Sequence, residues 1–132
     1  MSKILIVEDD PLMARLYQKI FSLEGFEVEL ATNGEEGLEK ARSIKPNLML
    51  LDIMMPRMNG LQVLEQLKAH PDTRSIPVVM LTNLAGSHDM ESALSKGAIK
   101  YLIKSEFEPK QVVAMVKEIL SAIQKSDTPI ST

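Results

Sequence analysis

The carboxylates of this 132-residue chain fall at positions where they could act together. Glu8, Asp9 and Asp10 follow one apolar run, and Asp52 follows another. Carboxylates that are brought together repel one another and raise each other's pKa unless a cation neutralises them. A hard divalent cation meets that need, and Mg²⁺ suits best because proteins commonly hold it through one or two carboxylates together with a phosphate. We therefore expect Glu8, Asp9 and Asp52 to form a magnesium site.

Asp52 is also a candidate nucleophile. A carboxylate can attack phosphorus to form an aspartyl phosphate, and the protein then mainly positions the groups and neutralises charge. Thr82 and Lys104 follow two further apolar runs, where they add a hydroxyl donor and a positive charge for phosphate oxygens. An acid directly after an apolar run is costly unless it is used or paired. The pattern favours phosphoryl transfer with Asp52 as the acceptor.

These residues need a scaffold that brings the ends of several strands together. Short apolar runs of strand length alternate with helix-like segments along the chain. Right-handed crossovers then predict an α/β fold with a single doubly wound, five-stranded parallel sheet. The strand order 2-1-3-4-5 fits, because the second run alternates like an edge strand, and ligands bind outside the carboxyl ends of such sheets. The expected strands are Lys3–Val7, Glu27–Ala31, Leu48–Leu51, Pro77–Leu81 and Tyr101–Ile103.

The helices between the strands carry start and stop signals. Asp10-Pro11 places a cap before a proline at the first helical position, and Thr32 with Glu35 predicts a capping box. Gly25 and Gly97 are expected to end the first and fourth helices. Apolar spacing predicts core-facing stripes formed by Leu12, Leu16, Ile20 and Leu23 in the first helix and by Val112, Val116, Leu120 and Ile123 in the last.

Composition bounds the organisation of the chain. The length suits one domain, expected at residues 1–125, followed by a flexible tail or the start of a linker at residues 126–132. The net charge of −3 and the absence of a basic block argue against direct nucleic-acid binding. No cysteine, signal-like segment or apolar run of membrane-spanning length occurs, so we expect a cytoplasmic protein that does not engage a membrane.

Four motifs resemble those of a known family. They are Ile4-Leu5-Ile6-Val7-Glu8-Asp9-Asp10-Pro11, Leu50-Leu51-Asp52-Ile53-Met54-Met55-Pro56 with Asn59-Gly60, Leu81-Thr82, and Lys100-Tyr101-Leu102-Ile103-Lys104. In this order, and at the expected strand ends, they resemble the receiver domain of two-component response regulators, the CheY-like fold. The resemblance covers about residues 3–124, which is nearly the whole chain.

The resemblance implies a phosphoacceptor signalling switch. Asp52 would take a phosphoryl group from a histidine kinase or a histidine phosphotransfer protein. Mg²⁺ would be held by Asp9, Asp52 and the backbone carbonyl of Met54, with Glu8 in the outer shell. The domain would promote its own phosphotransfer and slow dephosphorylation and would not otherwise act as an enzyme.

The resemblance also implies how the signal spreads. Thr82 would move toward the phosphate and Tyr101 would turn inward, which reshapes the surface of the fourth helix, fifth strand and fifth helix. Biasing a two-state equilibrium in this way lets a local charge change be read by a downstream partner. We expect a monomer or a weak dimer, since nothing in the sequence requires a stable oligomer.

Four residues depart from the family pattern. Ser105 follows Lys104 where many receivers have a proline joined by a cis bond, and a cis bond before a non-proline residue costs about 3 kcal/mol, so the resemblance leaves this loop's shape open. Asn83 stands where a small residue is usual, and its amide could contact or partly cover the phosphate. Met54 and Leu84 occupy the two positions that tune dephosphorylation, and neither can orient a water by hydrogen bonding. We therefore expect slow self-dephosphorylation.

Two other functions compete with the switch. A Mg²⁺-dependent phosphatase with an aspartyl nucleophile would need a second acid two residues after Asp52, where Met54 stands. A flavin carrier of flavodoxin-like topology would need Gly, Ser and Thr donors in the first loop, which is acidic here. The switch is therefore preferred, either as a stand-alone receiver or as part of a longer regulator.

Overall fold

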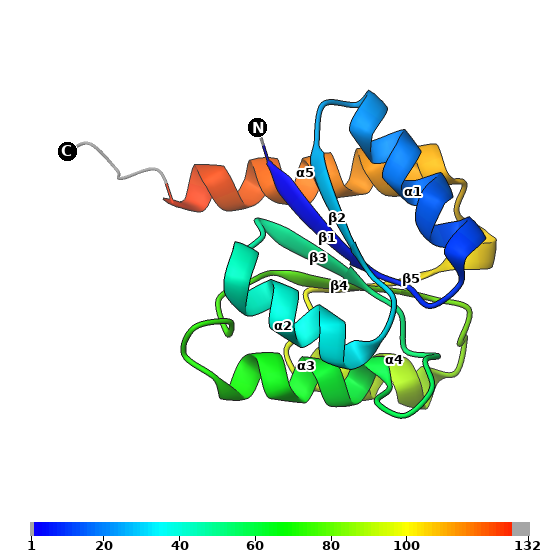
Figure 1. Cartoon of the computed structure of the whole chain (residues 1–132), viewed down its shortest axis with the longest axis vertical. Coiled ribbons are helices and arrows are strands. Elements are labelled where there is room, and N and C mark those ends of the chain that lie inside the picture. The colour runs from blue at the N-terminus through cyan, green and yellow to red at the C-terminus, as the bar shows by residue number, and fades with distance from the viewer. Residues whose placement is uncertain (1, 128–132) are drawn as a thin grey trace.

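A computed structural model describes residues 2–127 and contains a central sheet flanked by helices (Figure 1). Strands and helices alternate along the chain, as the sequence predicts. The elements are β1 (Lys3–Val7), α1 (Pro11–Leu23), β2 (Glu27–Ala31), α2 (Gly34–Ile44), β3 (Leu48–Leu51), α3 (Gly60–Ala69), β4 (Val78–Thr82), α4 (Ser87–Ser95), β5 (Lys100–Ile103), a short 3₁₀ helix η1 (Lys104–Glu106) and α5 (Pro109–Asp127).

The sheet has five parallel strands in the order β2-β1-β3-β4-β5, which confirms the predicted fold class. β1, β3 and β4 are almost entirely buried, as expected for parallel strands covered on both faces. β2 lies at one edge of the sheet and alternates between exposed and more buried residues, as expected for an edge strand. The carboxyl ends of β1 and β3 are neighbours in register, with Val7 opposite Leu51.

The helices cover the sheet in two groups (Figure 1). α1 and α5 lie on one face, where Tyr17, Phe21, Val112 and Val116 pack with Ile4 and other strand residues. α2, α3 and α4 cover the opposite face and pack on a second core cluster. The sheet therefore has a core on each side, and its carboxyl edge is left to the connecting loops.

The predicted stripe of α1 was wrong. Leu12, Leu16 and Leu23 are exposed, by 78%, 41% and 74%, whereas the buried residues of this helix are Ala14, Tyr17 and Phe21. Ile20 of the predicted stripe packs against the core from a half-buried position. In α5 the prediction was confirmed for Val112, Val116 and Leu120, which are buried, while Ile123 is half-buried.

The start of α2 lies one residue later than predicted. Asn33, not Thr32, is the N-cap, and its side chain accepts a hydrogen bond from the Glu36 N–H at 2.8 Å. The Glu36 carboxylate in turn accepts from the Thr32 N–H at 2.7 Å. Glu35 therefore does not take part in the cap.

Other boundaries follow the predictions closely. Asp10 caps α1 through the Leu12 N–H at 3.0 Å, and Gly25 and Gly97 adopt positive φ just after α1 and α4. β4 ends at Thr82, one residue later than predicted. α5 continues to Asp127, so it includes the first two residues of the expected 126–132 tail, and residues 128–132 lie outside the described part. Within residues 2–127, no helix has the length and apolar character needed to cross a bilayer.

The end of α2 stores local backbone strain. Lys45 caps this helix with φ 46° and ψ 68°, a left-handed conformation that favours glycine. We expect Lys45→Gly to raise the free energy of unfolding by about 1 kcal/mol, because glycine adopts this conformation without the clash of a Cβ atom. Urea denaturation of the variant measures the gain. Lys45→Ala keeps the clash and should show no gain, and equal stability of both variants would contradict the strain.

Candidate functional site

The carboxylates predicted to act together do meet at the carboxyl ends of β1 and β3. Glu8, Asp9 and Asp52 each place a carboxylate oxygen so that all three lie within 4.8 Å of one another. Glu8 and Asp52 are only 4% and 6% exposed, whereas Asp9 faces solvent. The cluster therefore has a buried floor and an open acidic side, an arrangement that could hold a metal ion.

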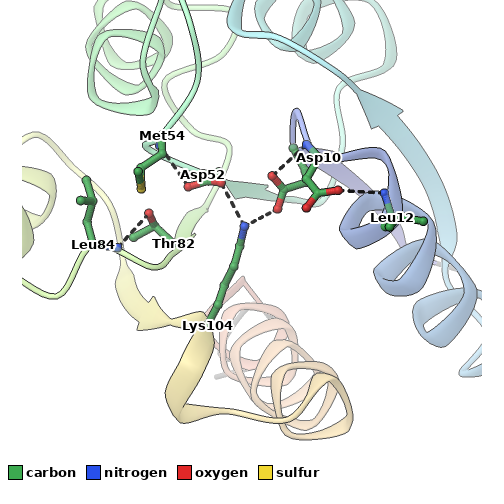
Figure 2. Close-up of polar contacts among 8 residues, drawn as sticks. Asp10, Leu12, Asp52, Met54, Thr82, Leu84 and Lys104 are labelled. Carbon is green, nitrogen blue, oxygen red and sulfur yellow. Dashed lines mark hydrogen bonds and ion pairs between the residues drawn. The ribbon is translucent and has the colours of Figure 1, made fainter.

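Lys104 crosses from the end of β5 into this cluster. Its ammonium donates to the Glu8 carboxylate and to Asp52 Oδ2, the latter at 3.0 Å (Figure 2). Only 9% of the Lys104 side chain is exposed, so both ion pairs are shielded from solvent. η1 begins at Lys104, and the described residues contain no cis peptide bond, so the Lys104–Ser105 bond is trans.

One ammonium group does not balance this much negative charge. Burial raises the pKa of Glu8 above its ordinary 4.5, and the charge of Asp52 adds to the rise although Lys104 opposes it. Burial by itself would lower the pKa of Lys104, but its bonds to Glu8 and Asp52 outweigh that effect and raise it. Asp9 adds a third carboxylate. The donor set thus fits a hard divalent cation such as Mg²⁺, which would supply the missing positive charge.

The raised pKa of Glu8 predicts a pH dependence of stability. Because the folded protein holds this proton more tightly than the unfolded chain does, the stabilisation is complete below pH 4.5 and is lost as the pH rises through the folded pKa. We expect the wild type to lose stability relative to Glu8→Gln as the pH is raised from 4.5 in metal-free buffer. Urea denaturation across this range measures the difference, and parallel stability curves would contradict it.

The Asp52 backbone is held from several directions. Its N–H donates to the Val7 carbonyl at 3.2 Å, and its Oδ1 accepts the Met54 N–H at 3.1 Å (Figure 2). Gly60, the first residue of α3, approaches so closely that a Cβ atom there would lie 2.1 Å from the Asp52 carbonyl oxygen. The Met54 side chain extends outward, and this residue is 54% exposed. Asp52 is therefore fixed at the floor of the site, below an exposed loop.

Thr82 and Tyr101 each form a hydrogen bond with the backbone of Leu84. The Thr82 hydroxyl accepts the Leu84 N–H at 3.4 Å, and the Tyr101 hydroxyl donates to the Leu84 carbonyl at 2.7 Å. Thr82 is fully buried and Tyr101 is half-buried, while the neighbouring Asn83 is exposed. The backbone of Leu84 thus connects the predicted switch residues.

Sequence reasoning missed one residue beside the site. Tyr17 is a buried residue of α1, only 2% exposed, and it lines a small void of about 10 Å³ together with Glu8 and Asp52. Burial raises the pKa of its hydroxyl. The charge of Lys104 opposes this rise in pKa, and the charge of Glu8 adds to it. No sequence signal marks this position, because a tyrosine in an amphipathic helix is ordinarily a packing residue.

Comparison with known proteins independently supports the resemblance to receiver domains. Residues 4–117 match a family model described as the response regulator receiver domain. The chain is 37% identical over 115 residues to the DNA-binding response regulator MtrA of Mycolicibacterium smegmatis, covering 87% of this chain and 49% of that protein. It is 33% identical over 126 residues to the probable transcriptional regulator ycf27 of Porphyridium aerugineum, covering 96% and 51%. The chain thus spans about half the length of the curated relatives it matches.

Solved structures agree with these relatives. A CheY-like response regulator receiver domain protein from Methanospirillum hungatei is similar with a TM-score of 0.87 and 34% identity, covering 96% of this chain and 98% of the other. The chemotaxis protein CheY4 of Vibrio cholerae is similar with a TM-score of 0.83 and 25% identity, covering 89% and 98%.

Proposed function

This chain belongs to the response regulator receiver domain family, and we propose that it is a signalling switch that accepts a phosphoryl group on Asp52 from a phosphohistidine. Receiver domains are signalling domains and are generally not classed as enzymes. The observation that carries the proposal is the shared ammonium of Lys104, which joins Glu8 and Asp52 at the edge of the sheet.

Asp52 has the properties of a phosphoryl acceptor. Its backbone is fixed, one carboxylate oxygen is held by the Met54 N–H, and the other faces Lys104. In the transfer, a carboxylate oxygen of Asp52 forms a bond to phosphorus while the P–N bond of the phosphohistidine breaks and its electron pair leaves with the histidine nitrogen. Lys104 neutralises charge on the phosphoryl oxygens, and the Thr82 hydroxyl donates to one of them.

The cation expected at this site is Mg²⁺. Asp9, Asp52 and the Met54 carbonyl would hold it, with Glu8 in the outer shell, and the bound ion would neutralise charge between the carboxylates and the phosphoryl group. The support in this chain is the acidic cluster itself, in which Glu8 and Asp52 share the ammonium of Lys104 and Asp9 adds a third carboxylate.

Readout of the phosphoryl group would run through Leu84. When Thr82 turns to the phosphate, the Leu84 backbone that it contacts shifts, and Leu84 also carries the bond to the Tyr101 hydroxyl. The surface formed by α4, β5 and α5 would change with it and bind a downstream partner. Both this partner and the histidine kinase or phosphotransfer protein that supplies the group belong to the proposal.

The setting of the domain is likewise proposed. The matched relatives are about twice as long, and one is named a probable transcriptional regulator and the other a DNA-binding response regulator. We propose that this receiver either acts alone or controls an attached effector domain in a longer chain. We propose a cytoplasmic location, a monomer or weak dimer, and no direct nucleic-acid contact by the receiver itself.

Slow loss of the phosphoryl group is expected from Met54 and Leu84. Neither side chain can orient an attacking water by a hydrogen bond, and Met54 is exposed beside the acceptor. We expect the double variant with Met54→Asn and Leu84→Glu to dephosphorylate about tenfold faster, because each new polar group can position water. Decay after removal of the donor, followed by intact mass, measures the change. Equal decay of the variant and the wild type would count against this account.

The proposal is tested by transfer from a protein donor. A histidine phosphotransfer protein carrying radiolabelled phosphate is mixed with the wild type, with Asp52→Asn and with chelated wild type. Label should move to the untreated wild type alone. Movement of label to Asp52→Asn would contradict Asp52 as the acceptor.

A further inference from the structure

Met54 combines exposure with closeness to the phosphoryl acceptor. Within residues 2–127 it is the one methionine that is exposed, at 54%, whereas the others are buried or half-buried. The Met54 backbone N–H donates a hydrogen bond to Asp52 Oδ1 at 3.1 Å, so the Met54 side chain leaves the backbone directly beside the acceptor carboxylate. Figure 2 shows the Met54 side chain on the side of Asp52 where Thr82 and Leu84 lie. A chemical change at this sulfur would therefore alter the solvent-facing surface beside Asp52.

We propose that Met54 is a site of reversible oxidation and that its sulfoxide shortens the lifetime of the phosphoryl group on Asp52. This inference rests on the proposed function and adds a form of regulation to the same site. It makes the signal shorter when peroxide is present.

The oxidant for the Met54 sulfur is hydrogen peroxide. The thioether sulfur of Met54 donates an electron pair to one oxygen of hydrogen peroxide as the O–O bond breaks. The hydroxide that leaves takes the proton from the transferred oxygen, so the products are methionine sulfoxide and water. A thiol-dependent methionine sulfoxide reductase reverses the step. Exposure favours Met54 over the buried Met49, Met55 and Met80, which a peroxide reaches only when the fold opens.

Oxidation of Met54 makes the solvent-facing surface beside Asp52 more polar and has little effect on packing. The flanking side chains of Met54 and Leu84 are apolar, so they offer no acceptor for a water approaching the phosphorus atom. A sulfoxide oxygen is a hydrogen-bond acceptor and can hold such a water in place. Because Met54 is exposed, its oxidation places no polar group in the core, so the folded state should keep its stability.

The experiment compares each protein with itself before and after peroxide. Wild type, Met54→Leu and Met54→Gln are treated with hydrogen peroxide, cleared of it with catalase, and mapped by peptide mass for oxidised methionines. They are then phosphorylated with acetyl phosphate and Mg²⁺, and decay is followed by intact mass after the donor is removed. Leucine keeps the apolar bulk without a sulfur, and glutamine supplies a permanent polar acceptor.

We expect Met54 to be oxidised before the other methionines of residues 2–127. The lifetime in the oxidised wild type should fall about fivefold, the size of effect that one added hydrogen bond gives. Sulfoxide reductase should restore it, Met54→Gln should decay fast without peroxide, and Met54→Leu should decay at one rate with and without it.

Three results would overturn the inference: unchanged decay in wild type that carries the Met54 sulfoxide, an equal peroxide effect in Met54→Leu, or earlier oxidation of another methionine of residues 2–127 with Met54 intact. In each of these cases the untreated protein is still phosphorylated, so the proposed function stands. Failure of the untreated wild type to take up a phosphoryl group would overturn both.

Discussion

Lys104→Met is expected to lower the free energy of unfolding by about 3 kcal/mol in metal-free buffer at neutral pH, because it leaves two buried carboxylates without their cation. Glu8 and Asp52 are 4% and 6% exposed, so water cannot replace the ammonium that both of them share. The same variant should accept a phosphoryl group about a hundredfold more slowly, since a preorganised charge at the phosphoryl oxygens is lost. Urea denaturation and the rate of phosphoryl uptake measure the two effects.

An exposed ion pair supplies the matched control. Lys117 pairs with Glu24 at 3.1 Å on the surface, where both side chains are 48% exposed. Lys117→Met should cost less than about 1 kcal/mol, because solvent screens such pairs. Mg²⁺ should return part of the stability lost in Lys104→Met by neutralising the carboxylates. If Lys104→Met matches the control and ignores Mg²⁺, the buried charge cluster does not carry the energy assigned to it.

Gly60→Ala is expected to cost about 3 kcal/mol and to reduce phosphoryl uptake as well. A Cβ atom at this position would lie 2.1 Å from the Asp52 carbonyl oxygen and 2.8 Å from the Ile53 Cα, both of them backbone atoms. The start of α3 or the acceptor loop must shift to relieve these contacts, and overpacking of this kind is destabilising. Because Asp52 belongs to the displaced backbone, its carboxylate moves away from Lys104. Chemical denaturation and phosphoryl uptake by intact mass measure both consequences.

Gly86 is the matched glycine for that experiment, because it also stands at the start of a helix. A Cβ atom there would lie 3.2 Å from a carboxylate oxygen of Asp89, the far end of a movable side chain. Gly86→Ala should cost about 1 kcal/mol or less and leave uptake unchanged. Equal effects of the two alanine variants would show that the close approach of α3 to Asp52 has no special role.

The site was predictable because it depends on a rule about strand ends. Each of Glu8, Asp52 and Lys104 follows an apolar run, and parallel strands deliver their carboxyl ends to one edge of the sheet. The meeting of these residues therefore follows from the order of the elements. The individual roles do not follow from the order of the elements. The hydrogen bonds that join the Leu84 backbone to the hydroxyls of Thr82 and Tyr101 depend on a loop conformation that no sequence pattern specifies.

The α1 stripe failed for a physical reason. The helix contains two overlapping apolar series, one through Leu12 and Leu16 and another through Tyr17 and Phe21, and periodicity alone does not rank them. The aromatic rings bury more area than leucine, so the second series turns toward the sheet. Composition weighted by side-chain area would have favoured it.

The shifted cap of α2 has a similar cause in packing. Gly34 begins this helix where a Cβ atom would lie 2.8 Å from Val63 and 2.9 Å from the Met58 carbonyl oxygen. Contact with Val63 and Met58 therefore requires a glycine at the first helical position, directly after the Asn33 cap. Local capping rules predicted the type of motif, but they do not include contacts from distant segments.

The central claim is tested most directly by the intact mass of the protein after incubation with acetyl phosphate and Mg²⁺. The account predicts a gain of one phosphoryl group by the wild type, absent from Asp52→Asn and from a chelated sample, and borohydride reduction should locate it at Asp52. No gain by the wild type, or an equal gain by Asp52→Asn, would contradict Asp52 as a phosphoryl acceptor.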